Sequence, residues 1–153
     1  MLKGISIIII CISIMTACSN FPASPPASDQ SGASADLQTN VLAGQSWLLS
    51  PVKVREMLQT ATPPKIIDVR TPEEYVAGCL EGATDIDIAA PDFESKLATL
   101  DKNASYLVYC RSGRRSADAV QRMKNLGFGN IVELEGGINA WQAQGMPIKN
   151  NCS

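Results

Sequence analysis

Short runs of apolar, β-favouring residues alternate with helical segments along most of this chain, and this alternation restricts the fold more than any other feature. The runs at 65–69, 84–88, 104–109 and 130–134 predict strands. Helical spacing or helix-start signals predict helices from 51, from 71, and over 92–100, 116–126 and 138–144. Strands that alternate with helices predict an α/β fold, with a mostly parallel sheet covered on both faces.

Two helix starts carry recognisable capping residues. Ser50 precedes Pro51, which suits the first helical position. Thr71 is followed three residues later by Glu74, so that their side chains and backbone amides can form a capping box. Ligands of parallel sheets bind beyond the carboxyl ends of the strands, so the residues after each strand are the first candidates for a site.

The first 45 residues do not share this pattern. Lys3 gives a basic start, and the apolar run that follows has the length of a signal-peptide core, short of the roughly 20 residues that a spanning helix needs. The run ends in Met15-Thr16-Ala17-Cys18, which resembles a bacterial lipobox with Met15 where Leu is more usual. We expect residues 1–17 to be a lipoprotein signal peptide and Cys18 to be lipidated; an uncleaved anchor or an ordinary signal peptide is the alternative.

Residues 18–45 are expected to be the lipidated cysteine and a flexible linker. The stretch is rich in Ser, Pro and Ala, and its polar composition cannot bury enough surface to fold. The folded domain is predicted at 46–148, with a tail at 149–153. The expected location is the bacterial cell envelope, facing the periplasm; Ser19 after the lipobox slightly favours the outer membrane.

Composition excludes several kinds of chemistry. The chain has no histidine, which removes Cys–His and Ser–His–Asp catalysis and most zinc sites. Its formal charge is −2 and no basic stripe occurs, so nucleic acid is not expected as a partner. We expect no metal, no cofactor and a monomer.

The five cysteines do not form a CxxC pair, so each needs its own explanation. Cys11 would leave with the signal peptide, and Cys18 would carry lipid. Cys79, Cys110 and Cys152 then remain in the folded domain.

Cys110 lies directly after the strand at 104–109 and before the helix at 116–126. Loop amides and a helix N-terminus carry partial positive charge, which favours thiolate and predicts a pKa below about 8.5 for Cys110. Gly113 allows the loop to curl, and three arginines add charge nearby: Arg111, Arg114 and Arg115. The sequence therefore predicts a ring of N–H donors around one sulfur atom.

The segment Cys110-Arg-Ser-Gly-Arg-Arg-Ser116 resembles the active loop of the rhodanese family. Three further motifs agree in order. Ile67 to Tyr75 is similar to the family's Asp-Val-Arg segment, and Gly78 to Ala83 stands where the family has Gly-His-Ile-Pro-Gly-Ala. Leu134 to Trp141, with Gly145-Met-Pro-Ile148, is similar to its Gly-Gly…Trp and Gly-x-Pro pattern.

This resemblance implies a three-layer domain with a five-stranded sheet, and a sulfurtransferase with Cys110 as the catalytic nucleophile. The donor would be thiosulfate or a persulfide or polysulfide, and the acceptor a thiol, cyanide or a partner protein. A protein-phosphatase loop would have Arg where Ser116 stands; the shorter loop ending at Arg115 suits sulfur better than phosphate or arsenate. The alternative is a non-catalytic rhodanese-like lipoprotein that carries sulfur, senses or binds a protein.

The loop residues 111–115 are the expected substrate-binding set, with their amides holding the persulfide: Arg111, Ser112, Gly113, Arg114 and Arg115. The three arginines attract anionic donors or lie on a solvated face; both options stay open. Ser112 and Ser116 are expected to cap the next helix. The resemblance implies structural roles for Asp68 and Arg70, with Arg70 paired to an acid such as Glu74.

Other motif residues are expected to be structural. Trp141 is assigned to the core, and Gly136 and Gly137 to a tight turn; Tyr109 lines the pocket or faces the core. Cys79 replaces the family's usual histidine. A Cys79–Cys152 disulfide is favoured outside the cytoplasm; a resolving role against Cys110 and two unpaired thiols are the alternatives.

Overall fold

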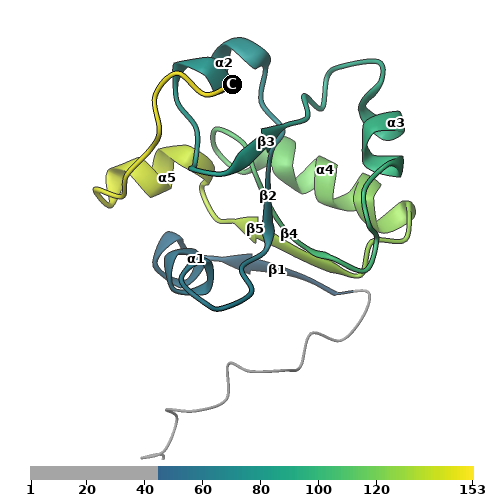
Figure 1. Ribbon diagram of the computed structural model, residues 1–153, viewed down its shortest axis with the longest axis horizontal. Coiled ribbons are helices and arrows are strands. Elements are labelled where there is room, and N and C mark those ends of the chain that lie inside the picture. The colour runs from purple at the N-terminus through teal and green to yellow at the C-terminus, as the bar shows by residue number, and fades with distance from the viewer. Residues whose placement is uncertain (1–44) are drawn as a thin grey trace, which may run out of the picture. The chain divides into compact units, whose positions relative to one another are not determined.

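The computed structural model describes residues 45–153, which fold into strands and helices in strict alternation (Figure 1). The strands are β1 (Gln45–Leu49), β2 (Lys65–Asp68), β3 (Ala83–Asp85), β4 (Ser105–Tyr109) and β5 (Asn130–Leu134). The helices are α1 (Pro51–Leu58), α2 (Pro72–Ala77), α3 (Phe93–Ala98), α4 (Arg114–Asn125) and α5 (Gly137–Ala143). No helix of this part of the chain has the length and apolar character to cross a membrane.

The expectations for the N-terminus lie outside the described residues. They are the signal peptide at 1–17, the loss of Cys11, the lipidation of Cys18 and the linker as far as residue 44.

The five strands form one sheet in the order β1-β5-β4-β2-β3, and every neighbouring pair is parallel. The prediction of an α/β fold with a five-stranded, mostly parallel sheet is therefore confirmed. Because the strands run the same way, their carboxyl ends meet at one edge, where β4 ends next to β2 and β5. The residues that follow Tyr109 lie at that edge.

Side chains alternate between the two faces of the sheet, and each face has its own core. Ile67, Val108 and Ile131 pack with α3 and α4, through Phe93 and Met123 among others. On the other face the strand residues pack with α1 and α5; this cluster includes Ile66, Leu107, Val132, Val54 and Trp141. Figure 1 shows the same three layers, with the sheet between the two pairs of helices.

The strand β1 was not predicted, and the assignment of Gln45 to the linker is wrong. Gln45 begins β1 and pairs with Asn130 of β5. The segment Gln-Ser-Trp-Leu-Leu has neither alternation nor β-branched residues, so tertiary pairing makes it a strand rather than local preference. Strand β3 ends at Asp85, three residues before the predicted end, and α4 begins two residues early, at Arg114.

The start of α2 follows the prediction. Thr71 Oγ accepts a hydrogen bond from the Glu74 amide at 3.4 Å, and Glu74 Oε2 accepts one from the Thr71 amide at 3.3 Å. Ser50 is the N-cap of α1 as expected, although its side chain makes no capping hydrogen bond.

The segment 149–153, expected to be a tail, is part of the fold. Lys149 forms an antiparallel bridge with Cys79, with N–O distances of 2.9 and 2.8 Å. The C-terminus therefore lies beside α2 in Figure 1.

Candidate active site

Cys110 follows β4 directly, at the carboxyl edge of the sheet. Its side chain is 1% exposed and joins the core on the α3–α4 face, where Val108 also points. The next residues along the loop, Arg111 and Ser112, are exposed. The sulfur therefore lies at the base of a loop whose outer side faces solvent.

Hydrogen-bond donors surround the Cys110 sulfur. The Gly113 amide donates to Sγ at 3.2 Å, and the Ser116 hydroxyl lies 3.6 Å from it. Burial acts to raise the pKa of Cys110, but the Ser116 hydroxyl and the amides of Ser116, Ser112 and Gly113 outweigh it and leave the pKa below its ordinary value. Donors therefore face the sulfur, but the contributing amides are those of residues 112, 113 and 116, and not the whole expected set 111–115.

Two glycine turns allow the loop to close. Gly113 has φ +101°, in the left-handed region that favours glycine, which brings its amide over the sulfur. The turn before α5 supports the loop from the other side: the Ile138 amide donates to the Cys110 carbonyl at 2.9 Å, and the Asn139 amide to the Arg111 carbonyl at 3.1 Å.

Gly137 fits this contact because it has no side chain. Its φ is +60°, and a β-carbon there would meet the Cys110 carbonyl oxygen and lie 2.7 Å from the Arg111 carbonyl group. The tight turn is as predicted, but its packing on the loop after Cys110 was not expected. The spacing of Gly136-Gly137 from Cys110 holds no signal of this contact, which depends on β4 and β5 being neighbours.

The three loop arginines have different surroundings. Arg115 donates to both oxygens of Glu74, at 2.6 and 2.9 Å, and this pairing raises its pKa, with a further contribution from the Cys110 sulfur. Arg111 and Arg114 are exposed, and neither forms an ion pair with another described residue. Glu74 therefore fixes one cation beside the sulfur.

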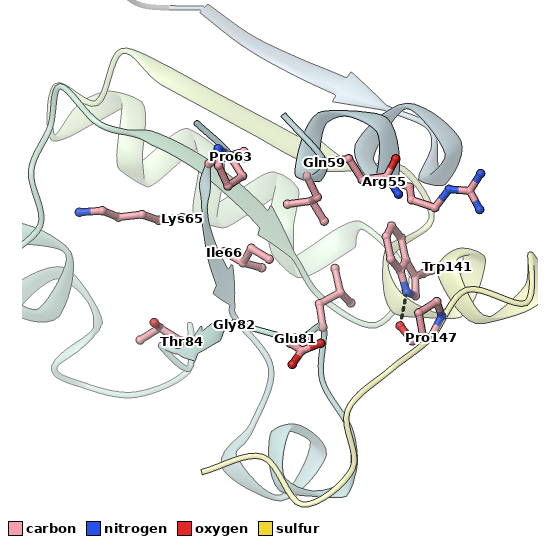
Figure 2. A pocket seen from close by; sticks show the side chains of 13 residues that line it. Arg55, Gln59, Pro63, Lys65, Ile66, Glu81, Gly82, Thr84, Trp141 and Pro147 are labelled. Carbon is pink, nitrogen blue, oxygen red and sulfur yellow. Dashed lines mark hydrogen bonds between the residues drawn. The ribbon is translucent and has the colours of Figure 1, made fainter. Parts of the chain in front are cut away.

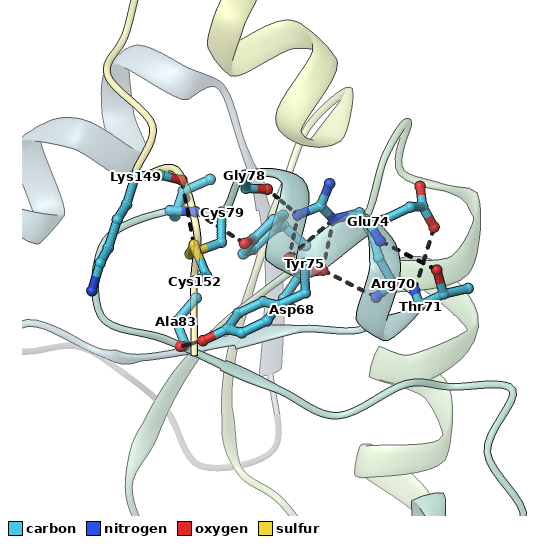
Figure 3. Close-up of polar contacts among 12 residues, drawn as sticks. Asp68, Arg70, Thr71, Glu74, Tyr75, Gly78, Cys79, Ala83, Lys149 and Cys152 are labelled. Atoms are coloured by element: carbon cyan, nitrogen blue, oxygen red, sulfur yellow. Dashed lines mark hydrogen bonds and ion pairs between the residues drawn. A yellow bond between two sulfur atoms is a disulfide. The ribbon is translucent and has the colours of Figure 1, made fainter.

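The expected pairing of Arg70 with Glu74 is wrong. Arg70 pairs with Asp68 at 2.6 Å, and the same nitrogen donates to the Gly78 carbonyl (Figure 3). Both side chains are buried, 6% and 0% exposed, so the pair joins the end of β2 to the segment after α2. Arg115 takes Glu74 instead, because the capping box presents that carboxylate toward α4.

The expectation that Ser112 and Ser116 cap α4 is wrong. The N-cap of α4 is Gly113, without a side-chain capping bond, and Ser112 is exposed. Ser116 Oγ lies 2.8 Å from the Gly113 carbonyl, 2.7 Å from Glu133 Oε1 and 3.6 Å from Cys110 Sγ. Glu133 was not among the predicted site residues, although a charged residue among Ile131, Val132 and Leu134 was a visible signal.

Cys79 and Cys152 form a disulfide, with 6.3 Å between their Cα atoms. Of the three alternatives for these cysteines, the bridge is the one present in the structure. Figure 3 shows it beside Tyr75, whose hydroxyl donates to the Ala83 carbonyl at 2.6 Å. Cys110 is the free cysteine of the described residues.

Tyr109 and Trp141 belong to the core on the α1–α5 face, away from Cys110. The Tyr109 hydroxyl accepts a hydrogen bond from the Leu80 amide at 3.1 Å. Trp141 donates to the Pro147 carbonyl at 2.8 Å and borders a cavity of about 640 Å³ between α1 and β2 (Figure 2). No residue of the loop 110–116 lines that cavity. The candidate active site is the loop, because the loop holds Cys110 and the donors that face its sulfur.

Comparison with known proteins gives matches that cover the same part of the chain. Residues 50–144 match the family described as the rhodanese-like domain. The chain is 33% identical over 79 residues to the thiosulfate sulfurtransferase GlpE of Pseudomonas entomophila, covering 51% of this chain and 70% of the relative. It is also 33% identical over 105 residues to the probable adenylyltransferase/sulfurtransferase MoeZ of Mycobacterium tuberculosis, covering 69% of this chain but only 27% of that longer protein.

A solved structure agrees with these matches. A rhodanese-related protein from Thermoplasma volcanium is 31% identical, with a TM-score of 0.60 over 67% of this chain and 97% of its own.

Proposed function

The chain belongs to the rhodanese-like domain family, and on that premise we propose that it moves a sulfane sulfur between small molecules through a persulfide on Cys110. The donor is thiosulfate or a persulfide or polysulfide, and the acceptor is a thiol or cyanide. The observation that carries this proposal is the sulfur atom of Cys110 within a ring of donors, with a lowered pKa.

The first step needs a thiolate but no general base. Cys110 Sγ attacks the outer sulfur of thiosulfate, a new S–S bond forms, and sulfite leaves with the electron pair of the bond that breaks. The persulfide anion that results carries its charge on the outer sulfur. The amide of Gly113, which already donates to Sγ, and those of Ser112 and Ser116 are the groups placed to stabilise it.

The second step returns the enzyme to its starting form. The acceptor attacks the outer sulfur, and Cys110 leaves as a thiolate, which the same donors stabilise. Arg115 is placed to attract anionic donors and acceptors, because Glu74 holds its guanidinium group near the sulfur. Glu74 lowers the net charge there, so Arg115 orients an anion more than it concentrates anions.

The burial of Cys110 favours small substrates. Its side chain is 1% exposed, so a donor must present a narrow sulfur end to the loop opening. Thiosulfate and a linear persulfide have such an end, whereas the loop closed by Arg115 leaves less room for a phosphate group. This supports sulfur transfer over phosphate or arsenate chemistry.

We extend the proposal to location: the domain is tethered in the bacterial envelope through a lipidated Cys18. The lipobox-like Met15-Thr16-Ala17-Cys18 supports this, and so does the Cys79–Cys152 bridge, because disulfides persist outside the cytoplasm. Labelling with palmitate tests it. The label is expected on the full chain and should disappear with Cys18→Ala; label that survives this change refutes the anchor.

The transfer proposal is tested on the intact mass of the protein. After incubation with thiosulfate, the protein should gain the mass of one sulfur atom and lose it again on addition of cyanide, with thiocyanate as the product. Cys110→Ser should abolish both the mass gain and thiocyanate formation, whereas Cys79→Ala/Cys152→Ala should keep them. A wild-type protein that gains no sulfur from thiosulfate, polysulfide or a low-molecular-weight persulfide is not a sulfurtransferase.

A further inference from the structure

Glu133 occupies a position in β5 where the sheet pattern expects an apolar residue. Its neighbours Val132 and Leu134 pack on the α1–α5 face, and Ile131, two residues earlier, packs on the α3–α4 face. Glu133 therefore points toward α4 and is half-buried there. It pairs in register with Val108 of β4, two residues before Cys110, so the carboxyl group and the sulfur lie on the same face.

One hydroxyl group joins Glu133 to the sulfur. Ser116 Oγ has the Glu133 carboxyl oxygen at 2.7 Å, the Gly113 carbonyl at 2.8 Å and Cys110 Sγ at 3.6 Å. A serine hydroxyl donates one hydrogen and accepts up to two. With Glu133 ionised and Cys110 a thiolate, all three neighbours are acceptors, and a single hydrogen has to serve them.

A proton on Glu133 reduces this conflict. The protonated carboxyl donates to Ser116 Oγ, so only the Gly113 carbonyl and Cys110 Sγ still share the Ser116 hydrogen. In the opposite state, with Glu133 ionised, the carboxylate takes the Ser116 hydrogen and adds a negative charge on the sulfur side of α4. The hydrogen bonds therefore favour a state with one proton on the carboxyl group and none on the sulfur, over a state with both groups ionised.

Within residues 45–153, Glu133 forms no ion pair that would cancel this preference. Its neighbours β1 and β4 and the helix α5 contain no Asp, Glu, Lys or Arg. On α4, Arg115 is paired with Glu74, and Arg122 is paired with both Asp118 and Glu94. The other cations on α4 are Arg114 in the first turn and Lys124 in the last. Burial raises the pKa of Glu133, and the bond to Ser116 lowers it by less.

We propose that Glu133 is a positioning residue for the reacting sulfur: its proton, acting through Ser116, directs a hydrogen bond onto Cys110 and couples the protonation of the two groups. The inference rests on Cys110 being the nucleophile of the proposed sulfurtransferase. The chain has no histidine, and in this proposal the protonation of the Glu133 carboxyl group influences whether Cys110 is a thiol or a thiolate. The motif of residues 110–116 does not contain Glu133, because Glu133 lies in β5 and the loop follows β4.

The alkylation rate of Cys110 by iodoacetamide, followed from pH 4 to 10, tests the coupling. Glu133→Gln is neutral at every pH and can donate permanently to Ser116. It should shift the alkylation midpoint down by about one pH unit, the size expected when a neighbouring like charge is removed. Glu135→Gln is the matched control, because Glu135 is exposed and lies two residues further along the chain. It should keep the wild-type midpoint.

A double-mutant cycle shows whether Ser116 carries the effect. On a Ser116→Ala background, Glu133→Gln should shift the midpoint no more than Glu135→Gln does. A full shift on that background means that the carboxylate acts through space, and the relay is then wrong. An unchanged midpoint for Glu133→Gln in otherwise native protein also overturns it.

A measurement on the wild-type side chain avoids dependence on folding of the variants. The carboxyl carbon of Glu133 is titrated by NMR with Cys110 free and with Cys110 capped as a methyl disulfide. Capping removes the thiolate charge, so the pKa of Glu133 should fall; equal midpoints contradict the coupling. Neither readout needs sulfur transfer. If the protein gains no persulfide, the proposed sulfurtransferase function is wrong, whatever the coupling. If it gains a persulfide but shows no coupling, only the proposed role of Glu133 is wrong.

Discussion

The two sulfur centres of this domain differ in what surrounds them. Cys110 lies at the carboxyl edge of the sheet, where the Ser116 hydroxyl and three amides face the sulfur. The Cys79–Cys152 bridge is equally buried, at 1% and 4% exposed, but packs with Tyr75 and Ala83. Burial alone therefore does not make a cysteine reactive or inert. Donors lower the pKa of one sulfur, and oxidation removes the others from titration.

The two centres also hold different parts of the chain. The Cys110 loop is held by local turns and by hydrogen bonds from the start of α5. The bridge joins residues 73 apart and ties the C-terminal segment to the chain after α2. We therefore expect changes at the bridge to act on stability and changes at the loop to act on sulfur transfer.

The largest expected effect is the loss of stability when the bridge is removed. Closing a loop of this size restricts the unfolded chain, so Cys79→Ala/Cys152→Ala should lower the free energy of unfolding by about 4 kcal/mol. Urea unfolding measures this. The ratio kcat/KM for thiosulfate, measured cold where the variant is folded, should stay within about twofold of wild type. A folded variant that has lost transfer would show that the bridge also shapes the active loop.

Next in size is Gly137→Ala, which acts on the loop rather than the bridge. The added β-carbon meets the carbonyl groups of Cys110 and Arg111 in a backbone with φ +60°. We expect about 3 kcal/mol lost in stability, since overpacking adds to the left-handed strain, and at least about a hundredfold loss in kcat/KM.

Gly145→Ala is the matched control for that substitution. Gly145 also has a left-handed φ, +68°, but no atom lies within 4 Å of a β-carbon there. It should cost about 1 kcal/mol of stability and leave kcat/KM unchanged. Equal effects of the two substitutions on transfer would mean that backbone strain, and not contact with the loop, explains the loss.

The fold followed from local signals wherever the burial was strong. Ser105–Tyr109 and Asn130–Leu134 are mostly apolar, and the Thr71–Glu74 capping box marks its own helix, so these elements were predictable. The strand β1 was not, because its residues show no period. It is a strand through pairing with β5, which only the folded chain provides.

The part of the site that is continuous in sequence was predictable. The residues that other helices and strands bring to the site were not. Cys110 and its donors occupy seven consecutive residues, so strand, loop and helix could be derived together. Three partners come from elsewhere: Glu74 from α2, Gly137 from the start of α5 and Glu133 from β5. The Arg70–Glu74 error has the same origin, because sequence shows which charges exist but not which helix faces them.

Arg115→Lys tests whether fixing the cation beside the sulfur matters. Lysine cannot form the two-bond pair that Arg115 makes with Glu74, so its charge would no longer be held in one place. We expect about a tenfold lower kcat/KM for thiosulfate and little change in stability. Arg122→Lys on the same helix, also ion-paired but exposed, should retain full activity. A similar loss in both variants would assign the effect to a general disturbance of α4, and not to the cation beside the sulfur.

The smallest expected effect is the dependence of stability on pH that Cys110 brings and the bridge lacks. The pKa of Cys110 is lowered in the folded protein, while the unfolded thiol titrates near about 8.5. Between these two values the unfolded state binds more protons than the folded state. The free energy of unfolding should therefore rise with pH through this window, by at most about 1.4 kcal/mol per pH unit. Above the window, the contribution of Cys110 has reached its full size.

The difference in unfolding free energy between wild type and Cys110→Ser measures this contribution together with the coupled change in the pKa of Glu133, because both proteins keep the bridge and the same carboxyl groups. The difference should grow in favour of wild type as the pH rises toward about 9, and become constant below the folded-state pKa. A difference that is flat with pH means that burial cancels the donors and that Cys110 titrates like an ordinary thiol. The contrast between the two sulfur centres would then be one of oxidation state alone.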